Sequence, residues 1–198
     1  MNVSLIIVLV VLGLIVIYSV SIYNRLVALK NRYQNAFAQI EVQLKRRYDL
    51  IPNLVETAKA YMAHERETLE AVTEARNTAL AGLKHAAAQP GEPGAMAELA
   101  GAEGALGAAL GRFNMVMEAY PDLKASENMR QLSETLTSTE NRVAFARQAF
   151  NDAVMQYNTY KQSFPPILLA GPMGHREDAA LLEFEDSAEI QAAPKVSF

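Results

Sequence analysis

The 198-residue sequence contains no cysteine and no tryptophan, and aromatic residues make up only 8% of it. The absence of cysteine excludes disulfides, thiolate nucleophiles and thiolate metal sites. The hydrophobic residues, 51% of the chain, are therefore mainly Ala, Leu, Val and Ile, a mixture that favours helices over sheets. We expect an all-α fold with one globular unit, since domains typically contain roughly 100 to 200 residues.

Basic charge is also scarce. The 18 lysines and arginines are outnumbered by 22 acidic residues, so the net charge is −4. The chain thus lacks the basic footprint of a protein that wraps nucleic acid, and we expect no nucleic-acid partner. No convergent nucleophile, base and metal constellation is visible either, so we expect no enzymatic activity, no metal and no cofactor. The three histidines have no metal-ligand spacing, and exposed or capping roles are expected for them.

What the sequence does contain is a long apolar segment at its amino terminus. No charged side chain precedes Arg25, and residues 5–20 are almost entirely Leu, Ile and Val. About 20 helical residues cross the roughly 30 Å hydrocarbon core of a bilayer. Residues 1–24 are therefore predicted to be a transmembrane anchor. A cleaved signal peptide is the alternative, although the basic region that begins such signals is missing.

Cationic residues follow this segment closely, at Arg25, Lys30 and Arg32, whereas none precedes it. The positive-inside rule then predicts a single-pass protein whose amino terminus lies outside and whose helical domain lies in the cytoplasm.

Apolar residues recur at steps of three or four through residues 25–164, which predicts amphipathic helices. The first stripe comprises Leu26, Leu29, Tyr33, Phe37, Ile40, Leu44, Tyr48 and Ile51, and its helix should grow directly out of the membrane span. A break is expected at Asp49 and Pro52, because proline lacks a backbone N–H and disfavours an α conformation before it. Residues 54–83, 99–120 and 129–157 carry three further stripes.

Proline and glycine mark the boundaries between these helices. Residues 89–94 are the clearest loop, and Ser126 is expected to cap the fourth helix through its hydroxyl. Four glycines between residues 101 and 111 lie near one face of the third helix; either a close helix contact compensates for their cost, or this helix is loose.

Four long helices with short connections should pack antiparallel around one core. We therefore divide the chain into the anchor at residues 1–24, a helical bundle at residues 25–164 and a tail at residues 165–198. Gly171, Pro172, Gly174 and Pro194 exclude a long helix in the tail, which is expected to be extended.

The cluster Lys45, Arg46 and Arg47 is the first candidate interface, and anionic lipid is an attractive partner for it. About 25 residues of helix, or some 37 Å, separate it from the membrane, however. Pairing with Asp49, Glu56 or acidic residues of the fourth helix is therefore the favoured interpretation, and a contact between subunits is the alternative.

Amides are concentrated on the first and fourth helices, and Asn35, Asn141, Asn151 and Asn158 are candidate interface residues among them. Amides that face a helix interface can bond across it and fix register or oligomeric state. Solvent exposure is the alternative for about half of them. Together the two sets indicate that these helices meet, within a subunit or between subunits.

Ile167, Leu168 and Leu169 form an apolar strip in the tail. Such a strip would be costly to leave exposed, so it is a third candidate for an interface.

Several longer motifs resemble the bacterial LemA family. They lie at residues 23–27 and 35–55, and again at 120–124, 136–142, 149–154, 157–158 and 164–165. The resemblance extends from Tyr23 to about Phe184, with Phe37 where the family often has tryptophan. It implies a membrane helix followed by an antiparallel bundle in the bacterial cytoplasmic (inner) membrane. It implies no catalytic activity, and suggests association with membrane-protease neighbourhoods and, in a magnetosome relative, membrane shaping.

Two functions are consistent with these features. The first is a homo-oligomeric scaffold that self-associates in the membrane plane and organises or shapes the bilayer. The second is an adaptor for another membrane protein, such as a membrane protease, with the tail as its docking segment.

Overall fold

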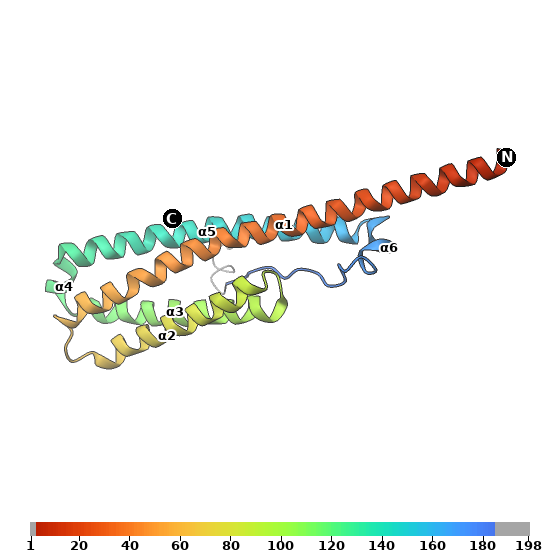
Figure 1. The fold of residues 1–198 in the computed structure, drawn as a ribbon. Coiled ribbons are helices and arrows are strands. Elements are labelled where there is room, and N and C mark those ends of the chain that lie inside the picture. The colour runs from red at the N-terminus through yellow and green to blue at the C-terminus, as the bar shows by residue number, and fades with distance from the viewer. Residues whose placement is uncertain (1–2, 185–198) are drawn as a thin grey trace, which may run out of the picture.

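The computed structural model of the protein describes residues 3–184, which form six helices and no strand. These are α1 (Val3–Lys59), α2 (Arg66–Ala88), α3 (Pro93–Met117), α4 (Pro121–Ala125), α5 (Glu127–Gln162) and α6 (Pro166–Ala170). The four long helices lie side by side with alternating direction, and α1 extends far beyond the others toward the amino terminus (Figure 1). The predicted all-α bundle with an amino-terminal apolar helix is confirmed.

The contact between α1 and α5 is the most extensive helix–helix contact of the bundle, and α2 packs against both α1 and α3. All eight residues of the first predicted stripe are buried. Tyr33 and Phe37 stack edge-on against Phe150, with ring centroids 6.3 and 5.5 Å apart. The two helices that carry most of the amides therefore do meet, within one subunit.

The amino-terminal part of α1 is uncovered. Residues 3–18 are exposed, and the first buried side chain of the helix is Ile22. Among the described residues, this stretch of α1 is the one segment long and apolar enough to cross a membrane. The helix runs without interruption from it into the bundle core.

Pro52 does not break α1, contrary to expectation. Because proline has no N–H, the carbonyl of Tyr48, four residues earlier, loses its partner within the helix. Arg76 of α2 replaces that partner: its Nε donates to the Tyr48 carbonyl oxygen at 3.1 Å. A side chain from a neighbouring helix thus repairs the hydrogen-bond ladder of α1 at Pro52.

The second predicted helix was placed wrongly. Leu54 and Ala58 belong to the end of α1, Tyr61 lies in the connection, and α2 begins only at Arg66. The chain reverses without glycine or proline, because the N–H groups of Tyr61 and Met62 both turn back to the Ala58 carbonyl while the Met62 side chain is fully buried.

The start of α5 lies where it was predicted, and the loop before α3 covers residues 89–92 of the predicted 89–94, because α3 begins at Pro93. Glu92 caps α3, its carboxylate accepting from the N–H groups of Gly94 and Ala95 at 2.9 and 2.5 Å. These two bonds lower the pKa of Glu92. Ser126 occupies the cap position of α5, but its hydroxyl makes no capping bond, so that part of the prediction is wrong.

Three of the four glycines between residues 101 and 111 of α3 do not provide a close helix contact within the chain. A Cβ atom at Gly101, Gly107 or Gly111 would meet nothing within 4 Å. The close approach between α2 and α3 occurs instead at Gly82, where an added Cβ would lie 3.5 Å from the Cα of Leu99.

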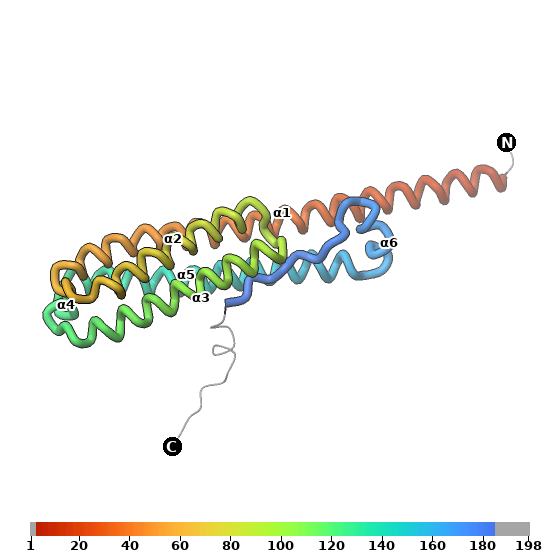
Figure 2. Tube along the Cα trace, turned by 90° about the horizontal axis from the view of Figure 1, so that it is seen from below, coloured from red at the N-terminus to blue at the C-terminus, as the bar shows by residue number. Residues whose placement is uncertain are grey.

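The tail is not simply extended. It begins with the short helix α6, and residues 171–184 then run back along the bundle in a largely extended conformation (Figure 2). The remainder of the predicted tail, residues 185–198, lies outside the described residues.

The repair at Pro52 is testable by a double-mutant cycle. Arg76→Met should leave the buried Tyr48 carbonyl without a donor and lower the free energy of unfolding by about 1–3 kcal/mol. Pro52→Ala restores the missing N–H, so Arg76→Met should cost much less in that background. Denaturation in detergent, followed by helical circular dichroism, measures both costs.

Arg66→Met is the matched control for this cycle. It removes an exposed pair with Glu70 on the same helix and should change the free energy of unfolding by no more than about 0.5 kcal/mol. If Arg76→Met lowered the free energy of unfolding equally in the Pro52 and Pro52→Ala backgrounds, Arg76 would not be the donor that replaces the missing N–H of Pro52.

Candidate functional site

A buried charge cluster joins three helices of the bundle. Arg47 of α1 donates to Glu103 of α3 at 2.7 Å and to Glu140 of α5 at 3.2 Å. Arg47 and Glu103 are both buried, whereas the Glu140 side chain is 50% exposed. The favoured interpretation, pairing with an acidic residue of the fourth helix, is therefore confirmed for Arg47, but its closest partner, Glu103, was not anticipated.

The second oxygen of Glu103 accepts a hydrogen bond from the Tyr48 hydroxyl. Tyr48 is fully buried, and this burial, reinforced by the negative charge of Glu103, raises the pKa of its phenol. The phenol remains a neutral donor at all physiological pH values, so Glu103 has a donor on each oxygen. A buried charge needs such complete pairing.

Lys45 and Arg46, the other two cations of the predicted basic interface, have environments different from that of Arg47. Lys45 pairs with Glu41 one turn away at 2.5 Å, on the exposed surface, and Arg46 is exposed. Lys45, Arg46 and Arg47 therefore do not form one surface patch, since the third side chain belongs to the core.

The amides of Asn151 and Asn158 bind the tail. Asn158 donates to the Ala179 carbonyl at 2.8 Å and accepts from the Ala179 N–H at 3.0 Å. Asn151 makes the same pair of bonds with Leu182, at 3.1 and 2.9 Å. Each amide therefore satisfies both backbone groups of one tail residue. The expectation that these side chains bond across the α1–α5 contact is wrong; we name them the tail clamp.

The spacing of the tail clamp explains why it works. Asn151 and Asn158 are one heptad apart, or about 10.5 Å along the helix axis. Three residues of extended chain, from Ala179 to Leu182, cover about 10 Å. A heptad on a helix therefore matches every third residue of an extended chain.

Other contacts also hold the tail against the bundle. Lys161 of α5, which is buried, pairs with Asp178 at 2.5 Å, and this hydrogen bond lowers the pKa of the Asp178 carboxyl. The Ala180 N–H donates to the Gly91 carbonyl in the α2–α3 loop at 2.8 Å. Gly91 has φ +85°, and an added Cβ would come within 3.2 Å of Ala179 and Tyr33.

His175 is buried, which corrects the expectation of an exposed or capping role. Its Nδ1 lies 2.9 Å from the Tyr157 hydroxyl, and its ring meets Tyr23 edge-on at 6.4 Å. Burial, with a smaller effect of Lys30 and Lys161, lowers the pKa of His175. The neutral ring thus joins the start of the tail to both α1 and α5. His85, by contrast, is exposed and lies 2.6 Å from Glu98.

The remaining candidate residues lie on the surface or at its edge. Asn35 and Asn141 are exposed on α1 and α5. Ile167 and Leu168 are exposed, while Leu169 is partly buried against the core. Among the described residues, no three His, Cys, Asp or Glu side chains gather as metal ligands would.

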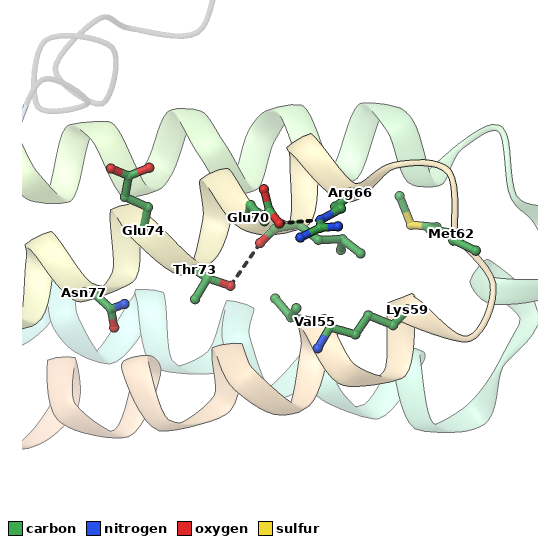
Figure 3. Close-up of a pocket in the computed structure, with 10 residues that line it drawn as sticks. Val55, Lys59, Met62, Arg66, Glu70, Thr73, Glu74 and Asn77 are labelled. Atoms are coloured by element: carbon green, nitrogen blue, oxygen red, sulfur yellow. Dashed lines mark hydrogen bonds and ion pairs between the residues drawn. The ribbon is translucent and has the colours of Figure 1, made fainter.

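A groove of about 720 Å³ lies between the end of α1 and the start of α2 (Figure 3). This is the end of the bundle farthest from the apolar segment (Figure 1). Its buried apolar part comprises Val55, Met62 and Leu69. Lys59 and the exposed ion pair of Arg66 with Glu70 lie at its rim. This distal groove offers an apolar slot with neutralised charges rather than an arrangement for acid–base chemistry.

A family model described as the LemA family matches residues 36–198. The chain belongs to the LemA family. The match covers most of the bundle and the tail, and begins after the first segment of the resemblance at residues 23–27.

Named relatives of this LemA family chain are similar at low identity. The magnetosome protein MamQ of Magnetospirillum gryphiswaldense is 26% identical over 163 residues, 75% of this chain and 60% of the relative. Magnetosome protein MamQ 2 of Paramagnetospirillum magneticum is 27% identical over the same coverage. Protein LemA of Metamycoplasma hominis is 26% identical over 141 residues, 71% of this chain and 60% of the relative. The chain thus spans about 60% of the length of these curated relatives.

The buried charge cluster predicts unequal costs for its two carboxylates. Glu103→Ala should leave the buried Arg47 without its closest partner and cost about 3–5 kcal/mol of unfolding free energy. Glu140→Ala, at a half-exposed position, should cost about 1 kcal/mol or less. Replacing Arg47 by Met and Glu103 by Leu together should recover part of the loss. Equal costs for the two single variants, measured by denaturation in detergent, would contradict the assignment.

The tail clamp predicts a local change in hydrogen exchange. With Asn151 and Asn158 both changed to Ala, the amides of Ala179 and Leu182 lose their acceptors, each worth about 1–3 kcal/mol when buried. Their exchange in the native state should accelerate, while amides inside α2 keep their protection. Asn141→Ala removes an exposed amide of the same helix and serves as the control. Unchanged exchange at Ala179 and Leu182 would count against the clamp.

Proposed function

We propose that this protein is a non-enzymatic, membrane-anchored scaffold that self-associates in the membrane plane and organises or shapes the bilayer. The observation that carries the proposal is the continuity of α1. One helix supplies both the exposed apolar segment and, from Ile22 to Ala58, the buried stripe of the bundle. The bundle is therefore not attached through a flexible linker.

The junction between the two parts of α1 is also braced from the side. Ile22 is buried, and Tyr23 contacts the ring of His175, which is in turn bonded to Tyr157 of α5. Swivelling of the bundle relative to the apolar segment would have to break this packing. If neighbouring bundles associate, their orientation is passed directly to the apolar segments.

The outer surface of α1 and α5 is the face we assign to self-association. Asn35, Lys45, Arg46 and Asn141 are exposed there. Arg47, Asn151 and Asn158 are removed from the predicted interface because their side chains bind within the chain.

Val42 and Phe145, on the sides of α1 and α5 opposite the core, remain 57% and 74% exposed. They lie at the same height, since the antiparallel pairs Arg47–Glu140 and Phe37–Phe150 flank them.

The proposed setting is the bacterial cytoplasmic membrane, with the amino terminus outside and the bundle in the cytoplasm. Arg25, Lys30 and Arg32 on the bundle side of the apolar segment support this orientation. Relatives named as magnetosome proteins favour a function on a membrane surface.

An adaptor for another membrane protein, such as a membrane protease, is the second candidate. The tail, which is the predicted docking segment of an adaptor, is already bound to the bundle of the same chain. The contacts extend to Phe184, whose ring packs against Arg147. The distal groove favours the adaptor function instead, because it lies at the end of the bundle farthest from the apolar segment, where a partner protein could reach it (Figure 1).

Single-cysteine crosslinking tests the scaffold, because the natural chain has no cysteine. Asn141→Cys and Phe145→Cys should form disulfide-linked dimers in native membranes under mild oxidation. Lys84→Cys, at an exposed position on α2, is the matched control and should crosslink much less. A monomeric mass in lipid nanodiscs, or equal crosslinking at all three positions, would contradict self-association through this face. Crosslinking from Lys59→Cys to another protein would favour the adaptor.

A further inference from the structure

The helix α6 lies beside α1 at the point where α1 leaves the bundle (Figure 1). At this level Ser19 is half-buried and Ile22 is buried, whereas residues 3–18 of α1 are all exposed. The contact of Tyr23 with His175 belongs to the same level. The corner formed by the end of α5 and α6 therefore sits level with the end of the apolar segment.

This corner has two unlike faces. Toward the bundle it buries Pro166 and Ala170. Away from the bundle it presents Phe164, Ile167 and Leu168, which are 80%, 54% and 64% exposed. Three large apolar side chains within five residues form a patch of the kind that marks an interaction site.

The surroundings of the patch match a lipid–water boundary. Burial raises the pKa of the Tyr160 phenol, and nearby Tyr18 raises it further while Arg25 lowers it. Tyr160, one turn before Phe164, lines one surface hollow together with the cationic Arg25 of α1, and the aromatic Tyr18 of α1 lies near enough to affect its pKa. Tyrosine is enriched at membrane interfaces, and arginine extends its charge toward the head groups.

We propose that Phe164, Ile167 and Leu168 insert into the lipid around the base of α1 and form a second membrane contact. The inference rests on the membrane anchoring contained in the proposed function. Residues 3–22 rise about 30 Å as a helix, which equals the thickness of the hydrocarbon core. Ile22 therefore reaches one boundary, and the three side chains beside it come to interfacial depth, where short apolar segments bury their side chains.

A second copy of the chain or another protein would cover the same patch without lipid contact. Lipid is favoured because the patch is level with the end of the span, so that the surrounding bilayer reaches it without any further partner. Two membrane contacts, α1 and α6, would fix the rotation of the bundle about the α1 axis.

Because the natural chain has no tryptophan, single-tryptophan variants report on one site each. Phe164→Trp and Leu168→Trp are placed in the full chain, which is reconstituted in phosphatidylcholine–phosphatidylglycerol vesicles with and without brominated acyl chains. Leu12→Trp reports on the span. Met115→Trp is the control. Met115 is similarly exposed and lies near the carboxyl end of α3, which adjoins α4 far from the apolar segment (Figure 1).

The emission of Phe164→Trp and Leu168→Trp should be shifted to the blue and quenched by brominated lipid severalfold more than that of Met115→Trp. Quenching at Leu12→Trp alone would overturn the proposal. A blue shift at Phe164→Trp and Leu168→Trp without quenching would also overturn it, since it would mean burial against protein. Quenching of these two probes in a protein that is monomeric in nanodiscs would support the lipid contact and contradict the scaffold.

Discussion

The continuity of α1 is the constraint on which the other features depend. The same helix contributes the exposed apolar segment and the stripe against which α5 and α2 pack. Continuity through Pro52 requires the Arg76 side chain of α2 at the Tyr48 carbonyl. The adjacent Tyr48 hydroxyl and Arg47 guanidinium hold Glu103 of α3. One short stretch of α1, around residues 47–52, therefore carries polar contacts to every other long helix, because Arg47 also reaches Glu140 of α5.

These polar contacts specify the arrangement more than they stabilise it. Replacing a buried ion pair by apolar residues is often neutral, whereas removing one partner is costly. Leucine and alanine recur along the buried faces of α2 and α3, so apolar contacts alone would allow these two helices to slide by a turn. The hydrogen bonds of Arg47 and Tyr48 form only in the helix register that places Glu103 next to both side chains. The tail clamp binds only a segment whose backbone N–H and C=O groups lie opposite Asn151 and Asn158.

Periodicity predicted the fold well because its signal is local. The stripe on α1 is confirmed residue by residue, and residues 89–92 of the predicted proline- and glycine-rich segment form the loop before α3. Pro52 was misread because its partner, Arg76, lies on another helix. The reversal after Lys59 was missed because residues 60–65 contain neither glycine nor proline, and only the packing of Met62 marks it. Asn151 and Asn158 were noticed, but an amide looks the same in a sequence whether it faces a helix or an extended strand.

The length of the buried part of α1 has a mechanical consequence. From Ile22 to Ala58 the helix rises about 55 Å, nearly twice the thickness of the hydrocarbon core. Tyr23 and His175 hold the base of the bundle rigidly to the apolar segment. The bundle therefore tilts together with the apolar segment, and it is the longer of the two. A tilt of about 10° at the bilayer moves the far end of such an arm sideways by about 10 Å. If α1 spans a bilayer as proposed, a small change of slope at the membrane would displace the distal groove by about the width of one helix.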